Sequence, residues 1–411
     1  MNRSLRHGRE IVAIPGPSMI PERVLNAMHR AMPNIYEGEL IDVSTSLFAD
    51  LPQIARTSGD AFITMSNGHG AWEMALTNTL SRGDRVLVLE SGLFANVWGR
   101  MANTLGIEVE TLPGDERLAV DPNAVEAALR ADAAHRIKAL LVVQVDTATS
   151  VRNDIAAVRA AMDAAGHPAL LMVDCIACLG CERFEMDDWG VDVTVAGSQK
   201  GLMVPPGLAF VWANEKAWSA YSRADLKTGY WDWGPRKTAE SHYLHYCGTP
   251  PIQHIYGLRE ALDMLFEEGL DNVWWRHEQL ADAVRAAVAA WSAGGQLAFN
   301  ITEPHQRSNA VTTIRASGID ADQMRSVAEH GAGLVLGINI GEFDNAFRIG
   351  HMGHLNPPAV LGVLGTIEAT LLALGARLPE SGVAAAAASL SDGLQATSEV
   401  ADSRNGIGSC C

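Results

Sequence analysis

The sequence has few basic residues, no long apolar run and no apolar leader. It contains 31 lysines and arginines against 48 aspartates and glutamates, a formal net charge of −17. This balance argues against nucleic acid or an anionic membrane as a partner. No stretch approaches the roughly 20 apolar residues of a transmembrane helix, and the first residues, MNRSLRHGREIVAIPGPS, lack the apolar core of a signal peptide. We therefore expect a cytoplasmic protein.

Cysteine is also scarce, with six residues in the chain. Cys175, Cys178 and Cys181 recur at every third position, a spacing also found among iron–sulfur ligands. No fourth cysteine is near, and the run follows directly after an apolar segment, so buried free thiols are the stronger interpretation. We predict neither a disulfide framework nor a bound metal.

The apolar content indicates a large globular protein. The chain has 411 residues, of which 48% are hydrophobic, enough for a sizeable core and two domains. Seven short apolar segments are predicted strands: 61–65, 86–90, 108–112, 139–145, 169–174, 191–195 and 208–212. Predicted helices lie at 21–32, 71–80, 97–105, 121–131 and 154–165, and a long helical stretch at 252–293. Apolar strands that alternate with helices predict an α/β fold, whose mostly parallel seven-stranded sheet is covered on both faces.

The last third of the chain has a different pattern. Predicted strands at 310–314 and 347–350 alternate with predicted helices at 320–330 and 357–374, which indicates a smaller α+β domain. We predict an N-terminal arm (1–20), a large domain (21–270), a small domain (271–385) and a disordered tail (386–411) rich in alanine, serine and glycine.

Lys200 lies on a loop of small residues between two predicted core strands, in Val195-Ala196-Gly197-Ser198-Gln199-Lys200-Gly201. A solvated surface lysine rarely has that setting. Asp174 ends another apolar strand, Leu170-Leu171-Met172-Val173-Asp174. A carboxylate at a strand end and a lysine on a glycine–serine loop suit pyridoxal phosphate (PLP). The lysine would form a Schiff base, and the aspartate would keep the ring nitrogen protonated.

Three turns could complete such a site. Gly68-His69-Gly70 lies between a predicted strand and a predicted helix, where free N–H groups and the helix dipole favour a phosphate. Phe94, after the next strand, could stack on the cofactor ring, although alone it is more simply a core residue. Thr149, in Asp146-Thr147-Ala148-Thr149-Ser150, could reach the phenolic oxygen of the ring or the substrate, or belong to an ordinary polar turn.

Arg348 is an arginine between apolar residues, with glycines close behind it at 350 and 353. A buried guanidinium needs an anionic partner, and its planar fork binds a carboxylate at two points. We therefore predict that Arg348 binds a substrate carboxylate, and the alternative is a structural ion pair.

These motifs resemble the class V aminotransferases of PLP fold type I. The resemblance rests on Asp174, on Gly-Ser-Gln-Lys-Gly around Lys200 with Pro205-Pro206-Gly207 after it, and on Arg348 in Arg-Ile-Gly-His-Met-Gly. It extends from Ile14 to about Ala388. Within the family, the chain is most similar to the alanine–, serine– and aspartate–glyoxylate aminotransferases.

The resemblance implies a set of site residues. Lys200 would form the Schiff base and transfer the proton, and Asp174 would pair with the ring nitrogen. The other implied cofactor-binding residues are Gly68, His69, Gly70, Phe94, Thr149, Ile176, Gln199, Tyr246 and Thr249. Tyr246 and Thr249 would reach the phosphate of the neighbouring subunit, so the resemblance also implies a homodimer with shared sites. The implied substrate-binding residues are Gly16, Pro17 and Arg348.

The sequence departs from the family at two places. Ser150 stands where the turn after the active-site threonine usually ends in glycine. Tyr36-Glu37-Gly38-Glu39 replaces a run of an acidic residue, His, Arg and Ser that glyoxylate enzymes commonly carry near the substrate mouth. The acidic replacement hints at an amino donor with a positive or hydroxyl-rich tail, unless Glu37 and Glu39 simply face water.

Transamination between a small amino acid and a short 2-oxo acid, such as glyoxylate or pyruvate, is the leading interpretation, by a ping-pong route through Lys200. A lyase or desulfurase of the same fold is an alternative. A desulfurase needs a cysteine on a mobile loop near the small domain, and residues 310–347 contain no cysteine. A non-catalytic scaffold would not need Lys200. A pyridoxamine–pyruvate type of transaminase would lack a good phosphate site, and Gly68-His69-Gly70 with Thr249 argues against this alternative.

Overall fold

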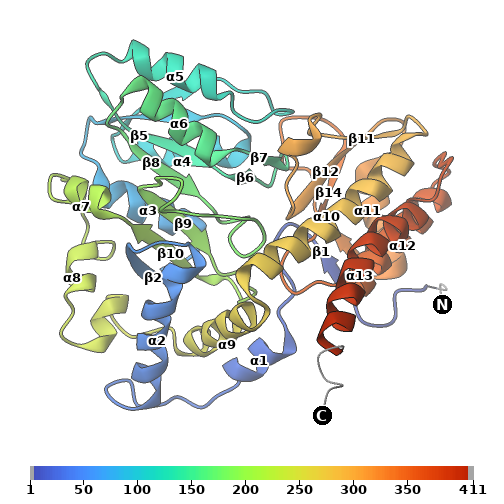
Figure 1. Cartoon of the computed structure of the whole chain (residues 1–411), viewed down its shortest axis with the longest axis horizontal. Helices are drawn as coiled ribbons and strands as arrows, with labels where there is room; N and C mark the ends of the chain where they lie inside the picture. The colour runs from blue at the N-terminus through green and yellow to red at the C-terminus, as the bar shows by residue number, and fades with distance from the viewer. Residues whose placement is uncertain (1–3, 406–411) are drawn as a thin grey trace.

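The structure is a computed structural model in which residues 4–405 are described. Figure 1 shows a large body built from the first two thirds of the chain, next to a smaller body that contains the orange and red elements. The long helix α10 (Leu270–Ser292) runs between the two. Each body has its own apolar core, so the fold can be described one body at a time.

A seven-stranded sheet forms the centre of the large body. Its order is β2-β10-β9-β8-β5-β3-β4, and β10 runs antiparallel to both of its neighbours while the other pairs are parallel. The strands are β2 (Asp60–Ser66), β3 (Arg85–Leu89), β4 (Glu108–Leu112), β5 (Ile137–Val143), β8 (Leu170–Asp174), β9 (Val193–Gly197) and β10 (Gly207–Ala213). All seven correspond to predicted strands, and the predicted α/β class is confirmed.

Both faces of this sheet are buried, which explains why its strands are continuous apolar runs. In β5, Leu140 and Val142 point into one core, and Leu141 and Val143 point into the other. One face is covered by α3 (Gly68–Thr79), α4 (Leu93–Thr104) and α7 (Glu215–Tyr221). The other face is covered by α2 (Glu39–Ile54), α5 (Pro122–Ala131), α6 (Ile155–Ala165) and α9 (Ile252–Glu268).

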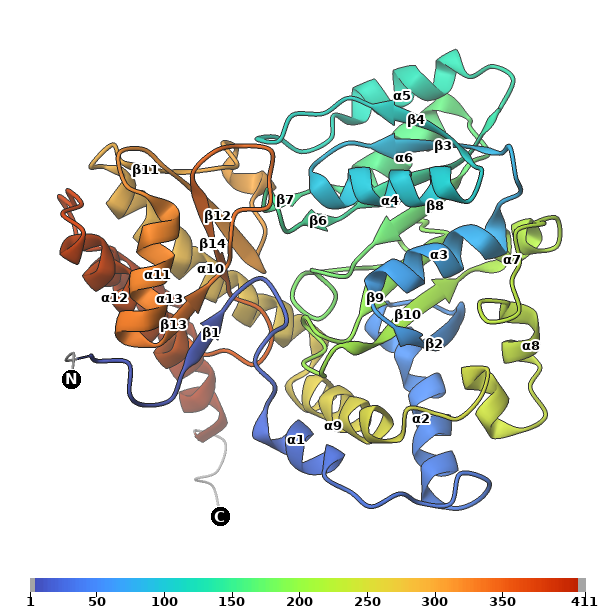
Figure 2. The ribbon, with the colours of Figure 1, turned by 180° about the vertical axis from the view of Figure 1, so that it is seen from behind.

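The small body contains a three-stranded antiparallel sheet, β11-β12-β14, with strands at Leu297–Phe299, Val311–Ala316 and Ala346–Gly350. Helices α10, α11 (Ala321–Ala332), α12 (Pro357–Ala373) and α13 (Gly382–Asn405) pack with it. The N-terminal strand β1 (Ile11–Ala13) pairs in parallel with β13 (Leu334–Leu336), and Figure 2 shows it beside the small body. The N-terminal arm therefore packs with elements from the last third of the chain.

Three elements differ from the sequence predictions. The helix α2 was not predicted, although Leu40, Leu47 and Leu51 are buried along one of its faces together with Ser44. The long helical stretch divides into α9 and α10 at Gly269, whose φ of 83° is left-handed and favours glycine. The short helix α8 (Trp233–Lys237) was not predicted either, whereas α1 (Glu22–Met28) lies within the predicted helix 21–32.

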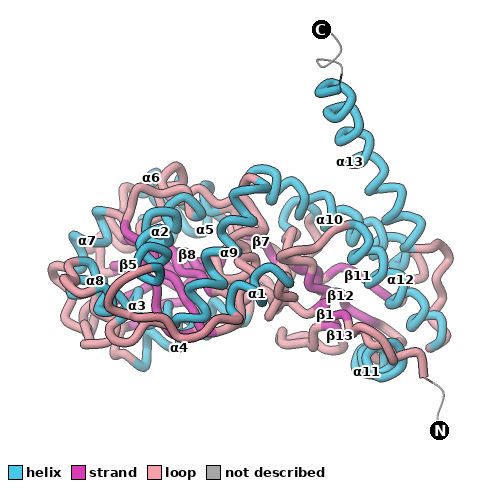
Figure 3. Tube along the Cα trace, turned by 90° about the horizontal axis from the view of Figure 1, so that it is seen from below, coloured by secondary structure: helices cyan, strands magenta, loops and turns pink. Residues whose placement is uncertain are grey.

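The predicted disordered tail is corrected by α13, which continues through Asn405. The helix packs along α10, and Ala386 and Leu390 are buried in the core of the small body, so alanine here provides close helix packing rather than disorder. Its last turns extend away from the rest of the molecule in Figure 3. Residues 406–411 of the predicted tail lie outside the described residues. Among residues 4–405, no helix combines the length and the apolar character needed to cross a membrane.

Candidate active site

A cavity of about 290 Å³ opens at the carboxyl ends of the parallel strands. Open α/β sheets commonly bind ligands at this edge. Nine of the predicted site residues line it: Gly16, Pro17, Gly68, His69, Phe94, Asp174, Ile176, Gln199 and Lys200. The structure therefore brings together turns from four different strands and a piece of the N-terminal arm.

Lys200 follows β9 and points into this cavity. Its ammonium group donates a hydrogen bond to the main-chain oxygen of Pro15, in the arm. Burial lowers the pKa of Lys200 to about 8, and the positive charge of Arg348 acts in the same direction while Asp174 opposes it. A lysine with this pKa is partly neutral near pH 8, which is the form that attacks a carbonyl.

Asp174 is the last residue of β8 and is almost fully buried. Its carboxylate accepts a hydrogen bond from the Ile176 main-chain N–H (2.6 Å) and another from the Trp72 indole N–H (2.9 Å). Burial raises the pKa of Asp174 to about 7. A cationic group placed against this carboxylate would lower that pKa and favour its charged form.

Trp72 lines the cavity but was not among the predicted site residues. Its ring centroid lies 4.6 Å from that of His69 and 6.4 Å from that of Phe94, and it stacks on Trp98 at 5.9 Å. It fixes the orientation of Asp174 through its indole N–H. The signal that could have identified it is helical spacing, because Trp72 follows His69 by three residues and therefore shares its face of α3.

Asp146 is a second residue that the sequence did not identify. It is fully buried and accepts hydrogen bonds from the main-chain N–H groups of Phe94 (2.8 Å) and Ala148 (2.9 Å). A Cβ atom on Gly92 would lie only 2.5 Å from its carboxyl carbon, so glycine is needed there. Burial raises the pKa of Asp146. Asp146 thus joins the turn that carries Phe94 to the turn that carries Thr149.

Thr149 does not line the cavity. Its hydroxyl donates to the main-chain oxygen of Ser91 at 3.0 Å, so it connects two turns behind the cavity wall. Thr147, two residues earlier, is the member of this turn that lines the cavity. A direct contact between Thr149 and a ring oxygen stays a prediction.

Arg348 lies on β14 and is buried just outside the cavity lining. Its guanidinium donates to the main-chain oxygens of Ile338 (2.7 Å) and Thr147 (2.8 Å). Burial lowers the pKa of Arg348 to about 10, and the charge of Asp146 opposes that shift. Within residues 4–405, both of its hydrogen bonds go to neutral oxygens, so the structural ion-pair alternative gains no support.

The remaining predicted residues lie farther from the cavity. Gly70 packs against Ser66, where an added Cβ would come within 2.5 Å of the serine side chain. Thr249 is exposed, as a contact with a second subunit requires. Tyr246 is fully buried in the core of its own chain, and its hydroxyl contacts that of Ser44. A contact between Tyr246 and the phosphate of a neighbouring subunit stays a prediction.

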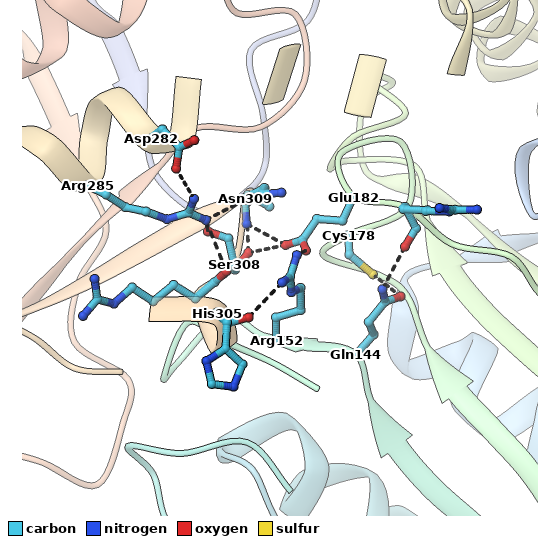
Figure 4. Close-up of polar contacts among 12 residues, drawn as sticks. Gln144, Arg152, Cys178, Glu182, Asp282, Arg285, His305, Ser308 and Asn309 are labelled. Atoms are coloured by element: carbon cyan, nitrogen blue, oxygen red, sulfur yellow. Dashed lines mark hydrogen bonds and ion pairs between the residues drawn. The ribbon is translucent and has the colours of Figure 1, made fainter. Parts of the chain in front are cut away.

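A polar seam joins the turn 146–152 to the small body. Figure 4 shows Glu182 between Arg152 and the segment Ser308–Asn309. The buried Glu182 carboxylate accepts from the Ser308 hydroxyl (2.6 Å) and the Asn309 main-chain N–H (2.7 Å), and it lies 3.7 Å from the Arg152 guanidinium. Below it, the Cys178 thiol contacts the Gln144 amide oxygen at 3.1 Å, and Cys175, Cys178 and Cys181 are buried free thiols. The seam holds the two bodies in one relative position.

The cavity wall fits a phosphorylated pyridine ring on two observations. The Ser66 hydroxyl, which can donate to an anion, is buried without a hydrogen-bond partner two residues before α3. The N-terminus of α3, with Gly68 and His69, faces the cavity and favours an anion. Unpaired buried polar atoms next to a helix N-terminus suit a phosphate group.

Comparison with known proteins agrees with this geometry. The family model described as Aminotransferase class-V matches residues 53–339, and the chain belongs to that family and is a transaminase. It is 42% identical over 400 residues to a serine–glyoxylate aminotransferase of Methylorubrum extorquens, covering 95% of this chain and 98% of the relative. It is 38% identical to an L-aspartate–glyoxylate aminotransferase of Paracoccus denitrificans, covering 91% of this chain and 94% of the relative.

The fold also matches solved structures. The chain superposes on the pyridoxamine–pyruvate aminotransferase of Mesorhizobium loti with a TM-score of 0.85 and 27% identity, over 94% of this chain and 98% of that one. The predicted family resemblance and the predicted enzyme class are therefore confirmed.

Proposed function

We propose that this transaminase binds PLP in the cavity and transfers an amino group from a small amino acid to a short 2-oxo acid such as glyoxylate or pyruvate. One observation carries the proposal: the amine of Lys200 and the carboxylate of Asp174 lie buried in the same cavity. The names of the relatives at 42% and 38% identity support glyoxylate as the acceptor.

PLP, when bound, supplies an electron-accepting ring on which the α-proton of the amino acid becomes acidic. The residues of the chain perform the other tasks. Lys200 would hold the cofactor through its amine and move a proton to and from the substrate, for which a pKa of about 8 is suited. The Pro15 oxygen holds its amine at the cavity mouth between transfers.

Asp174 would pair with the ring nitrogen of the cofactor and favour its protonated form. The Trp72 indole N–H donates to one oxygen of the Asp174 carboxylate, and the Ile176 main-chain N–H donates to the other. The two hydrogen bonds fix the orientation of the carboxylate. Phe94 and His69 line the cavity on either side of Trp72 and limit the ring to one orientation.

Arg348 binds the α-carboxylate of the substrate. Its guanidinium has five N–H groups, and its hydrogen bonds to the Ile338 and Thr147 oxygens leave others available for a carboxylate. Gly16 and Pro17 close the cavity from the arm, and an added Cβ at Gly16 would lie 2.5 Å from the Lys200 amine. Only glycine leaves that lysine room to move.

The donor is proposed to be small and without a cationic tail. Glu39 pairs with Arg30 at 2.9 Å, and Glu37 accepts from the Asn34 amide at 3.2 Å. Their charges are therefore partly engaged within the chain, which weakens the hint of a positively charged donor. A hydroxyl-bearing donor such as L-serine agrees with this arrangement and with the relative at 42% identity.

The enzyme is proposed to act as a cytoplasmic homodimer. Met32, Tyr36 and Leu244 are large apolar side chains that are 70%, 73% and 41% exposed, and Tyr36 contacts Tyr243. An exposed apolar group of this kind is typical of an interface. Thr249 lies on the same irregular segment as Leu244, so its predicted reach to the phosphate of a neighbouring site agrees with a dimer formed there.

A donor and acceptor screen tests the proposal. The purified protein, loaded with PLP, is mixed with single amino acids, and loss of the cofactor absorbance near the visible range identifies donors; a 2-oxo acid then restores it. We expect L-serine or L-alanine as donor and glyoxylate as acceptor. Failure of every small donor and acceptor would contradict the proposal.

The alternative of a pyridoxamine–pyruvate reaction has one specific support, the similarity to the Mesorhizobium loti enzyme. The same screen separates the two functions. Free pyridoxamine with pyruvate should give turnover in the unloaded protein if the alternative holds. The proposed function predicts turnover with PLP and amino acids and none with free pyridoxamine.

A further inference from the structure

The turn 146–152 makes several hydrogen bonds with the small body. Asn300 donates from its amide to the Thr149 oxygen at 3.1 Å, and Thr313 donates from its hydroxyl to the Ala148 oxygen at 3.1 Å. The Ser308 N–H donates to the Ser150 oxygen at 3.1 Å. A turn held at successive oxygens cannot shift without moving the small body.

Ser150 has an unusual backbone within this turn. Its φ is 65°, in the left-handed region where a side chain is unfavourable and glycine is at ease. Ser150 is also buried, and its N–H donates to the Asp146 oxygen at 2.8 Å. A residue with a side chain in this conformation needs a compensating contact made by that side chain.

The hydroxyl of Ser150 makes such a contact. Its oxygen accepts the main-chain N–H of Thr313, in β12, at 3.1 Å, and both residues are buried. Glycine at position 150 would fit the backbone better but would leave this N–H without its acceptor. A buried N–H without a partner is costly.

This contact leads directly to Arg348. Thr313 lies opposite Arg348 in the pairing of β12 with β14. Arg348 in turn donates to the oxygen of Thr147, three residues before Ser150. Ser150, Thr313, Arg348 and Thr147 therefore form a closed ring that spans the two bodies.

We propose that Ser150 is a positioning residue that sets the distance of the Arg348 guanidinium from the cavity, and thereby the affinity for substrate carboxylates. The inference rests on the proposed role of Arg348. Ser150 touches neither substrate nor cofactor in this assignment. It acts through the β12–β14 pair, and Glu182 supports it by holding Ser308, whose N–H binds the Ser150 oxygen.

The test compares Ser150→Gly with Ser150→Ala in the PLP-loaded full chain. Both variants lose the hydroxyl, so both should raise KM for L-serine and for glyoxylate by about three- to tenfold, with a smaller change in kcat. Only alanine keeps a Cβ atom on the left-handed backbone, which is unfavourable, so Ser150→Ala should unfold at a lower temperature than Ser150→Gly. If Ser150 had only a structural role, the variant with the lower unfolding temperature would also have the higher KM.

Hydrogen exchange gives a readout that needs neither cofactor nor activity. The Thr313 amide should exchange faster in both variants than in the wild type, because its acceptor has been removed. His135→Gly is the matched control: His135 is exposed, its φ is 49°, and it lies outside the cavity lining. This control should leave KM and Thr313 exchange unchanged.

The outcomes separate this inference from the proposed function. Unchanged KM values in both Ser150 variants, while Arg348→Lys raises KM, would overturn the positioning role alone. If Arg348→Lys also leaves KM unchanged, the carboxylate-binding role of Arg348 fails, and the inference fails with it. Unchanged exchange at Thr313 would overturn the contact on which the argument depends.

Discussion

Replacing Arg348 by lysine keeps the positive charge and removes the planar fork. In the structure, the Arg348 side chain contacts the Ile338 and Thr147 oxygens, 2.7 and 2.8 Å away, through separate nitrogens. A lysine has one nitrogen, which cannot make both contacts and still bind a carboxylate at two points. The variant should therefore lose at least one charged hydrogen bond to the substrate.

The size of the loss follows from that bond. A charged hydrogen bond contributes about 1.5–3 kcal/mol, and roughly 1.4 kcal/mol corresponds to a factor of ten. We expect Arg348→Lys to lower kcat/KM by about ten- to a hundredfold or more. The loss should appear with the amino acid and with the 2-oxo acid, because both carry the carboxylate that Arg348 binds. PLP affinity should barely change, since the Arg348 side chain lies outside the cavity lining.

Stopped-flow absorbance measures each half-reaction separately and avoids the ping-pong coupling of steady-state constants. Arg377→Lys, an exposed arginine of the small body, is the matched control and should behave like the wild type. The assignment of Arg348 is refuted if the variant loses PLP or unfolds while its remaining folded fraction retains a normal kcat/KM. That result would make Arg348 a structural residue.

Three further predictions concern the cofactor. Borohydride should fix PLP covalently to Lys200, and cofactor uptake by the unloaded protein should rise with pH up to about 8 and then level off. Burial lowers the pKa of Lys200 to about 8, so the reactive neutral amine is scarce below that pH. Cofactor uptake that does not change between pH 6.5 and 9, or covalent labelling of another residue, would contradict this prediction. Asp174→Asn should retain its circular dichroism and lose turnover by about a hundredfold or more, because the ring nitrogen loses its anionic partner; a near wild-type rate would make Asp174 structural. Thr249→Ala should weaken PLP retention in dialysis by about tenfold, the value of one charged hydrogen bond; an active monomer by light scattering contradicts the shared site.

Most of the sheet could be predicted because its central strands are buried on both faces. Such strands are short apolar runs between turns, as Leu170–Asp174 is, and that pattern is visible in one dimension. The turns that carry Gly68 and Lys200 could be located for the same reason, since they follow strand ends. The helix α2 was missed because its apolar stripe of Leu40, Leu47 and Leu51 is interrupted by polar residues and a proline.

The contacts between distant turns could not be predicted. Nothing local to Trp72 says that its indole will meet Asp174, 102 residues later, and nothing local to Asp146 says that it will hold the N-terminus of α4. Nor does anything local to Tyr246 say that its hydroxyl will meet Ser44 inside its own chain. Single sequences encode strand ends well and tertiary pairs poorly.

The order in which the chain is synthesised determines when the site can form. The Lys200 amine contacts Pro15 from the arm, and Arg348 reaches the Thr147 oxygen from the far end of the chain. Among residues 4–405, the strand β1 pairs with β13 alone, so the arm has no sheet partner until residues 334–336 have been made. A chain emerging from the ribosome can assemble the seven-stranded sheet well before this point, since domains form as their own residues become available. The catalytic cavity is therefore among the last features to be completed. A nascent chain released before β14 would contain the seven-stranded sheet but would lack a complete active site.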